Sequence, residues 1–372
     1  FDLDLLRSVA GRSTDQVAET ADRLIAAAIL VAGPGETIGL AHPSLRDSVY
    51  ADTSAVRRRL LHRRAGDALE HNEERRGEAA VHYEAAGVID RAAELHVAAA
   101  RHALATSANR HALTHVRSAL SLGHEDRAVL HEMSGDLEAL EGRYRDALQS
   151  YEIAAAIGMP DTLSRVEYKL GLLALRRGDP AAARSHLASA LAELGPAAGT
   201  LRAQILTAQA SAEERSGRLD VAADVAAEAV AVAEDTTAEA EAAAQCVAGG
   251  IALSAGSLEE AGLNLRSALR LAEVGRSSPA AAAAHNGLGL LSVRRSDFEV
   301  AVGHFEAAIA LLERQGDRHR LAAALSNLAD AHHEAGREGE SMTAMKRSSE
   351  LLADIGGDPL EGQAGVWSLT SW

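Results

Sequence analysis

Residues 289–308 read GLLSVRRSDFEVAVGHFEAA, and the spacing of five positions within this stretch decides the fold. A small residue, Gly289, is followed after seven positions by a turn residue, Ser296, and after five more by Ala301. A large residue, Phe305, comes four positions later, and a small one, Ala308, three after that. The same spacing occurs six times between residues 135 and 348. A fixed period of this kind predicts a repeat architecture.

Each copy predicts a pair of antiparallel helices. The small residue is expected where the two helices cross, because glycine lets a partner backbone approach. The glycine or serine seven positions later is expected in the left-handed conformation that ends a helix. The alanine then packs back against the crossing, and the large residue, such as Phe305, is expected to fill the gap to the next pair.

The period itself lengthens slightly along the chain. The residues that follow the turn are 36, 39, 39, 40 and 40 positions apart; they are Ala147, Ala183, Ala222, Ala261, Ala301 and Ser341. These separations exceed the 34 residues of a tetratricopeptide repeat. We expect the excess between the repeats, in segments such as 195–199 and 276–279.

The composition fits an array of closely packed helices. Hydrophobic residues make up 47% of the 372 residues but aromatic residues only 3%, and alanine, which dominates, has the best helix propensity. In an array each repeat buries its apolar face against its neighbours, so no single large core is needed.

The net charge and the single cysteine indicate what the chain does not bind and where in the cell it is expected. The net charge is −16, from 53 acidic and 37 basic residues, which argues against non-specific nucleic-acid binding by the whole chain. Cys246 is the only cysteine, so no internal disulfide is expected and a reducing, cytoplasmic location is predicted. No apolar run approaches the ~20 residues that span a bilayer, and no signal peptide is present. Because the chain begins at Phe1 rather than Met, we expect a fragment of a longer protein.

Four segments are predicted. Residues 1–55 contain a helix that Ser13 or Thr14 caps, two short β-type runs around Gly33-Pro34-Gly35, and a helix opened by Ser44, which together indicate a winged-helix-like segment. Residues 56–123 form a helical linker and the first helical repeats, with helices over 56–71, 78–86, 91–105 and 110–122. Residues 124–356 hold the six repeats, and residues 357–372 form a tail. The predicted fold is therefore all-α, a right-handed superhelix of helical hairpins.

The pattern of a small residue, an alanine and an aromatic residue in each copy resembles that of the tetratricopeptide family. The Trp that this family has in the first helix is missing here, and its closing Pro is mostly absent. Residues 40–50 (LAHPSLRDSVY) and 57–62 (RRRLLH) resemble the join between ATPase and sensor in large ATP-binding regulators of the LuxR type, within the signal-transduction ATPases with numerous domains. A similar join occurs in ATPase modules fused to nucleotide cyclases. The resemblance implies a nucleotide-binding domain, then a winged helix, then a helical superhelix that senses an inducer or partner.

Two parts of that family are absent from this sequence. It has no Gly-x4-Gly-Lys-Ser/Thr loop, and its C-terminal region shows no helix-turn-helix with a basic recognition helix. We therefore expect this fragment neither to hydrolyse ATP nor to bind DNA. It needs no cofactor of its own, while ATP or ADP and a contact with a nucleotide-binding domain are expected in the parent protein.

The resemblance also implies a role for His42. A winged-helix histidine in this family touches the β-phosphate of bound ADP, and His42 falls at the matching place; the alternative is a histidine that only caps the following helix. The arginines at 57–59, 63 and 64 also allow two interpretations. They bind a phosphate or an acidic protein surface, or they form the solvated face of a helix.

The concave groove of the superhelix is the remaining candidate site, since the first helix of each pair lines it in the tetratricopeptide family. The lining transferred by position is Arg165, Tyr168, Arg176, Gln204, Thr207, Arg215, Asn286 and Arg294. The arginines at 176, 215 and 294 recur at one repeat position and would suit an acidic peptide or a small anionic ligand. The alternative is that they pair with the chain's own acidic residues.

No constellation for catalysis or metal binding stands out. His111 and His115 lie one helical turn apart without a third ligand, and Cys246 has no paired base. We therefore expect that the chain has no enzymatic activity and binds no metal ion. The function predicted first is the sensor arm of an ATP-dependent bacterial signalling or transcriptional regulator; the alternatives are a constitutive protein-binding scaffold and the equivalent arm of a cyclase-linked ATPase.

Overall fold

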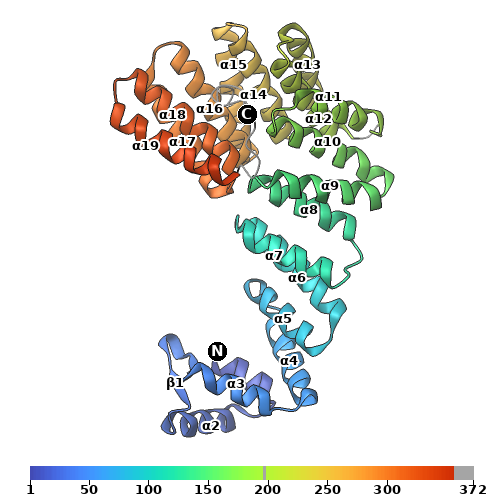
Figure 1. Cartoon of the computed structure of the whole chain (residues 1–372), viewed down its shortest axis with the longest axis vertical. Coiled ribbons are helices and arrows are strands. Elements are labelled where there is room, and N and C mark those ends of the chain that lie inside the picture. Colours follow the sequence, from blue (N-terminus) through green and yellow to red (C-terminus); the bar gives the residue numbers. More distant parts are fainter. Residues whose placement is uncertain (196–197, 356–372) are drawn as a thin grey trace. The chain divides into compact units, whose positions relative to one another are not determined.

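The structure is a computed structural model that describes residues 1–195 and 198–355. Nearly all of these residues lie in helices (Figure 1). The chain divides into two compact units, Phe1–Leu130 and His131–Trp372. None of the helices among the described residues has the length and apolarity that a membrane crossing requires.

The first unit begins with helices around a small hairpin. Its elements are α1 (Leu3–Ala10), α2 (Thr14–Ala26), β1 (Leu30–Ala32), β2 (Ile38–Leu40) and α3 (Pro43–Asp52), with a 3-10 turn, η1 (Pro34–Glu36), between the strands. The strands pair antiparallel with Val31 opposite Gly39. Ser13 caps α2 as predicted, in a capping box with Gln16. The winged-helix assignment stays a prediction.

The start of α3 differs from the prediction. The helix begins at Pro43 and its N-cap is His42, not Ser44, because proline fits the first turn of a helix and the backbone N–H of Ser44 already points at the His42 ring.

The rest of the first unit is helical. It contains α4 (Ala55–Leu69), η2 (Glu73–Arg75), α5 (Arg76–Ala86), α6 (Ile89–Ala105) and α7 (Asn109–Ser121). The four α-helices predicted here are confirmed, with ends that differ by no more than two residues. Helix α6 packs against both α5 and α7, so it serves two neighbouring pairs.

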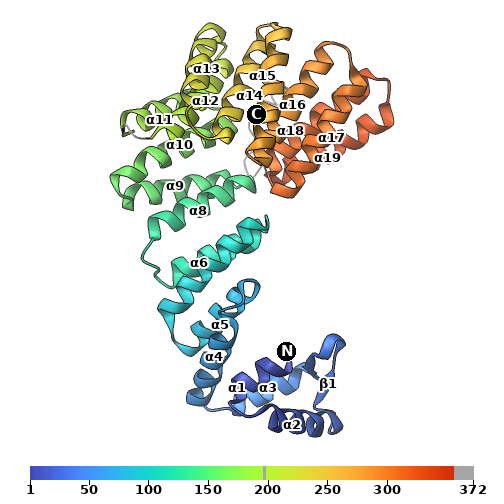
Figure 2. The same ribbon diagram turned by 180° about the vertical axis from the view of Figure 1, so that it is seen from behind.

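Six helical hairpins follow, and they confirm the repeat prediction. They are α8 (Arg127–Leu140) with α9 (Tyr144–Ile157), α10 (Pro160–Arg176) with α11 (Pro180–Ala192), α12 (Gly199–Arg215) with α13 (Leu219–Ala233), α14 (Ala238–Ser254) with α15 (Leu258–Val274), α16 (Ser278–Arg294) with α17 (Phe298–Gln315), and α18 (Arg318–Glu334) with α19 (Glu338–Ile355). Figures 1 and 2 show the hairpins from α10 to α19 stacked side by side.

The turn inside each hairpin has the predicted conformation. All six turn positions have positive φ, from 63° at Ser296 to 83° at Gly256. The left-handed conformation ends the first helix and lets the second return alongside it.

The crossing glycine is covered by the large residue of its hairpin as well as by the predicted alanine. The backbone oxygens of Ala183 and Ala261 lie 3.5 and 3.3 Å from a Cβ placed on Gly171 and Gly249. A Cβ placed on Gly289 would lie 2.5 Å from Cε1 of Phe305, and one on Gly135 would lie 2.5 Å from Cε1 of Tyr151. The large residue thus covers the glycine of its own hairpin. The reason is that helical side chains lean toward the N-terminus, so this residue reaches back over the preceding turn.

The large residue also reaches the next pair as predicted. Leu265 of α15 packs on Gly249 of its own hairpin and on Gly287 of α16, and Phe305 clusters with Leu321 and Leu325 of α18.

The residues by which each repeat exceeds 34 positions do not lie between the repeats, where we expected them. Ser278 and Pro279 belong to the first turn of α16, and Gly199 opens α12. Most first helices of the hairpins have 17 residues, so the extra length extends the helices themselves. Residues 196 and 197, and the predicted tail, lie outside the described residues.

Candidate functional site

The second unit contains a cavity of about 520 Å³. Its wall comes from α10, α12, α14, α16 and α18, which are the first helices of the hairpins, and from Leu265 of α15. This volume is in the range of sites that hold small molecules or a few peptide residues. We call this cavity the groove.

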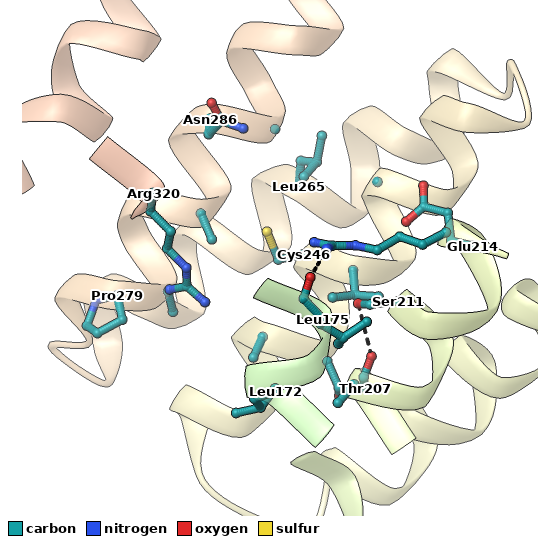
Figure 3. Close-up of a pocket in the computed structure, with 18 of the residues that line it drawn as sticks. Leu172, Leu175, Thr207, Ser211, Glu214, Cys246, Leu265, Pro279, Asn286 and Arg320 are labelled. Atoms are coloured by element: carbon teal, nitrogen blue, oxygen red, sulfur yellow. Dashed lines mark hydrogen bonds between the residues drawn. The ribbon is translucent and has the colours of Figure 1, made fainter. Parts of the chain in front are cut away.

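The groove exists because two neighbouring helices carry small side chains at the positions that face it. Helix α14 contributes Ala243 and Gly250, and α16 contributes Ala283 and Gly287. Leu265 reaches the groove because it packs where Gly287 has no side chain, 2.4 Å from the place that a Cβ would occupy. Figure 3 shows Cys246 on the floor, with Arg320 on one side and Glu214 on the other.

Seven of the eight residues predicted for the groove lie in its wall: Tyr168, Arg176, Gln204, Thr207, Arg215, Asn286 and Arg294. Arg165 does not. It lies on α10 and donates from Nε and Nη2 to the two carboxylate oxygens of Glu132, at 2.7 and 2.8 Å. Whether the seven bind a ligand remains a prediction.

The three arginines at the shared repeat position have different surroundings. Arg176 pairs with Asp317 through Nη2 and Oδ2 at 2.9 Å, which is the ion-pair alternative. Arg215 donates to the carbonyl oxygen of Leu175 at 2.7 Å, and burial lowers its pKa to about 10. The side chain of Arg294 is exposed and has no hydrogen bond or ion pair within residues 1–195 and 198–355.

The two glutamates of the groove are already hydrogen-bonded. Ser254 donates to Glu214 at 2.6 Å, and Ser277 donates to Glu239 at 2.9 Å. Burial raises the pKa of Glu214. One oxygen of each of these carboxylates thus already accepts a hydrogen bond from the chain itself.

Several polar groups that face the groove remain available as donors. Asn286 is 1% exposed, and its Oδ1 accepts from Nδ2 of Asn327 at 2.9 Å, which leaves its own amide N–H groups for the groove. Tyr168 and Gln204 have no hydrogen-bond partner in the part of the chain that the structure describes. Burial raises the pKa of Tyr168 to about 12, so its hydroxyl stays protonated. The wall therefore offers donors to a molecule that carries acceptors.

One end of the groove coincides with a contact between distant repeats. Asp317 pairs with Arg176, and the Tyr144 hydroxyl shares a hydrogen bond with Nδ1 of His319 at 2.5 Å. Burial, together with Arg176, lowers the pKa of His319 to about 3, so the ring is neutral. A Cβ on Gly142 would lie 2.7 Å from Ile355. We call the Arg176–Asp317 and Tyr144–His319 contacts the latch, since they close the first two hairpins onto the sixth.

Sequence reasoning missed the residues that α14 and α18 supply. His319 and Arg320 lie in the first turn of α18, away from the repeat position that the other arginines share, so the period gave no signal for them. The alanine runs at 242–244 and 280–284 were a usable signal, because runs of small residues in packed helices leave room beside the backbone.

The other residues considered from the sequence are His42 and the arginine cluster of the first unit, Cys246, and the possible metal ligands. His42 caps α3, where Nδ1 accepts from the backbone N–H of Ser44 at 3.3 Å; its contact with a nucleotide stays a prediction. Arg58 lies over the Tyr50 ring at 4.8 Å. Burial raises the pKa of the Cys246 thiol to about 12, so little thiolate forms. Among the described residues, no three His, Cys, Asp or Glu side chains are grouped to hold a metal ion.

Comparison with known proteins supports the repeat assignment. Residues 279–354 match the tetratricopeptide repeat family. No curated protein matches the chain.

Solved structures of similar fold are helical-repeat proteins. The Rap conjugation gene regulator of plasmid pLS20, in complex with a Phr peptide, is 13% identical with a TM-score of 0.60, over 84% of this chain and 90% of that one. A signal-transduction ATPase with numerous domains and a tetratricopeptide repeat sensor, from Pyrococcus horikoshii, is 13% identical with a TM-score of 0.53, over 95% of this chain and 56% of that one. The Cut9–Hcn1 assembly of the APC/C is 17% identical with a TM-score of 0.51, over 82% and 55%. At these identities the likeness concerns the fold, which is that of tetratricopeptide-type superhelices.

Proposed function

We propose that this chain is the sensor arm of a multidomain, ATP-dependent bacterial regulator in the cytoplasm, and that the groove is its sensing site. The observation that carries the proposal is the overlap of groove and latch, because Arg176 and His319 belong to both. A ligand in the groove therefore touches the two sides of the contact that closes the array.

A conformational response requires that the ligand prefer one arrangement over the other. The latch defines a closed arrangement, in which hairpins far apart in sequence are held together. A ligand that interacts differently with the closed and open arrangements shifts the balance between them. In the parent protein this shift would release or restrain the nucleotide-binding domain.

Two classes of ligand fit the groove: a peptide and a small anionic molecule. The donor-rich wall suits the carbonyl oxygens of a peptide and equally the oxygens of an anion. The Rap regulator of similar fold was solved with a peptide, which supports the first class by analogy. The ATPase of similar fold carries a tetratricopeptide repeat sensor, which supports an ATPase as the parent context by analogy. The output of that parent, LuxR-type or cyclase, rests on the sequence resemblance alone.

The second candidate function is a constitutive scaffold. The bond between Arg176 and Asp317 favours it, because an arginine that is already paired needs no ligand. A scaffold would bind its partner without any change of shape.

Solution scattering of the full chain distinguishes the two functions. Peptides and metabolites from the source cells are separated into fractions and tested for binding to the chain. We expect a fraction that binds to change the scattering curve. The variant Arg294→Glu should lose this response, because the charge facing the groove is reversed. The matched control is Arg314→Glu on α17, an exposed arginine outside the groove, which should respond like the wild type. Binding with an unchanged curve would favour the scaffold.

A further inference from the structure

Asp317 is a carboxylate that the chain holds between two arginines of the groove wall. Arg176 approaches it through Nη2 to Oδ2 at 2.9 Å and through Nη1 to Oδ1 at 3.4 Å, while Nε of Arg320 lies 3.8 Å from Oδ2. The backbone N–H of Arg320 also donates to Oδ1 at 3.2 Å. The side chain of Asp317 is only 2% exposed, so this carboxylate is enclosed.

The two arginines face the groove whereas the carboxylate does not. Arg176 and Arg320 line the groove and expose 21% and 30% of their side chains, and Asp317 lies behind them. If α18 moved away with Asp317, the Arg176 guanidinium would stay in a poorly hydrated place without its counter-charge. A buried charge that loses its partner is strongly unfavourable, so opening is resisted until another anion arrives.

We propose that Asp317 holds, in the closed array, the position that an anionic group of the groove's ligand takes when the array opens. The inference rests on the proposed function, since it assigns the ligand class and the switching step of the same groove. A carboxylate or phosphate that enters from the groove pairs with Arg176 as Asp317 did. The ion pair is thus exchanged rather than lost, and the latch is released.

The rest of the groove selects for an apolar body beside this anionic group. Leu172, Val247, Leu253 and Leu290 supply apolar wall. The shared chemistry is an apolar molecule with one anionic group. Its source is either a free small acid or an acidic side chain within an apolar peptide.

Binding of matched probes to the full chain tests the exchange. We expect decanoate to bind and decanamide, which has the same chain but no charge, to bind more weakly, as measured by calorimetry. In Asp317→Asn the competing charge is gone, so decanoate should bind at least about fivefold more tightly than to the wild type, a coupling of ordinary size. Decanamide should show no such gain.

The matched control is Asp354→Asn. Asp354 also pairs with an arginine of α18, Arg318, at 2.5 Å, but on the surface and outside the groove. Its removal should leave the affinity for decanoate unchanged. A second pair of probes identifies the source: an apolar peptide with a central glutamate and the same peptide with glutamine in its place. If the natural ligand is a peptide, the glutamate peptide should bind more tightly than decanoate and more tightly than the glutamine peptide. If it is a free small acid, decanoate should bind more tightly than either peptide.

Distances across the latch test the opening. Spin labels at Gln149→Cys on α9 and Glu350→Cys on α19 report the separation of the first and sixth hairpins. Cys246 is kept, because its buried thiol forms little thiolate and reacts poorly with the label. Decanoate should add a population at longer distance, and Asp317→Asn should show that population without any probe. Tyr144→Phe, which removes the other half of the latch, should also open the array but without increasing the preference for decanoate over decanamide.

Three results would overturn the exchange: decanoate bound no better than decanamide, an Asp317→Asn variant with unchanged or weaker affinity for decanoate, or no population at longer distance when decanoate binds. If decanamide opens the array as well as decanoate, ligand-driven opening stands and only the exchange fails. The scattering experiment on the wild-type chain decides the sensor function separately, because a change of its curve on binding does not require a charged ligand.

Discussion

Three pairs of histidines lie inside helical hairpins with their Nδ1 atoms about one hydrogen bond apart. The distances are 2.9 Å for His62–His82, 3.0 Å for His96–His115 and 3.1 Å for His285–His304. In each pair one ring donates and the other accepts, so the pair cannot hold a proton on both Nδ1 atoms. Burial lowers the pKa of all six rings.

These pairs predict a loss of stability in mild acid. A lowered pKa in the folded state means that the unfolded chain binds protons more readily below the ordinary histidine value of about 6.5. The stabilising contribution of each neutral pair is therefore present above that pH, and it declines as the pH falls toward the folded-state pKa. We expect the thermal unfolding midpoint of the full chain to fall between about pH 7 and pH 5.

The chain provides its own control for this prediction. In the α10–α11 hairpin the same place is taken by Glu167 and His186, with Oε2 and Nδ1 2.8 Å apart. His285→Glu copies this arrangement beside His304, so the variant should lose less stability in acid than the wild type. An equal or greater loss in the variant would contradict the interpretation.

The crossing glycines set how closely two helices of a hairpin approach. Gly289→Ala places a methyl group 2.5 Å from Cε1 of Phe305, and overpacking of this kind outweighs the gain in helix propensity. We expect the free energy of unfolding to fall by about 1 to 2 kcal/mol in chemical denaturation. Gly303→Ala on α17 has no atom within 4 Å of the added group and should instead stabilise by roughly 0.5 to 1 kcal/mol.

Ser296 is the one serine among the six hairpin turns, and its φ of 63° is strained for a residue with a side chain. Ser296→Gly should raise the free energy of unfolding by about 1 kcal/mol, because glycine adopts this conformation without the steric penalty. Gly178→Ser, at the equivalent turn with a φ of 74°, should lower it by a similar amount. Denaturant unfolding of both variants checks the prediction, and changes of the same sign would refute it.

The hairpins were predictable from the sequence because their determinants are local. The small residue, the turn residue and the large residue fall within 17 positions, and each acts on its own helix or on the adjacent one. The contact of Phe305 with Gly289 of its own hairpin was not predicted, because the lean of this side chain toward its helix N-terminus was not taken into account. The first turn of α16 was likewise mistaken for a connection, since Ser278-Pro279 reads equally well as a loop or as a helix start.

At the scale of the whole molecule, the groove belongs to one of the two units. Every residue of its wall lies in the second unit, His131–Trp372. We expect a chain lacking residues 1–130 to fold with its own cooperative transition and to bind decanoate with the affinity of the full chain, as measured by calorimetry. A truncated chain that folds but binds at least about fivefold more weakly would show that the first unit contributes to the site.

By itself the sequence determined the helical hairpins, their number from residue 127 onward and the side of the array on which seven of the groove residues lie. These features follow from periodic spacing, which fixes the face of a helix on which a residue sits. The latch was decided only by the tertiary structure. Tyr144 and His319 are 175 positions apart, and Arg176 and Asp317 are 141 apart, so their meeting depends on small rotations that accumulate from hairpin to hairpin, and no local spacing encodes that sum.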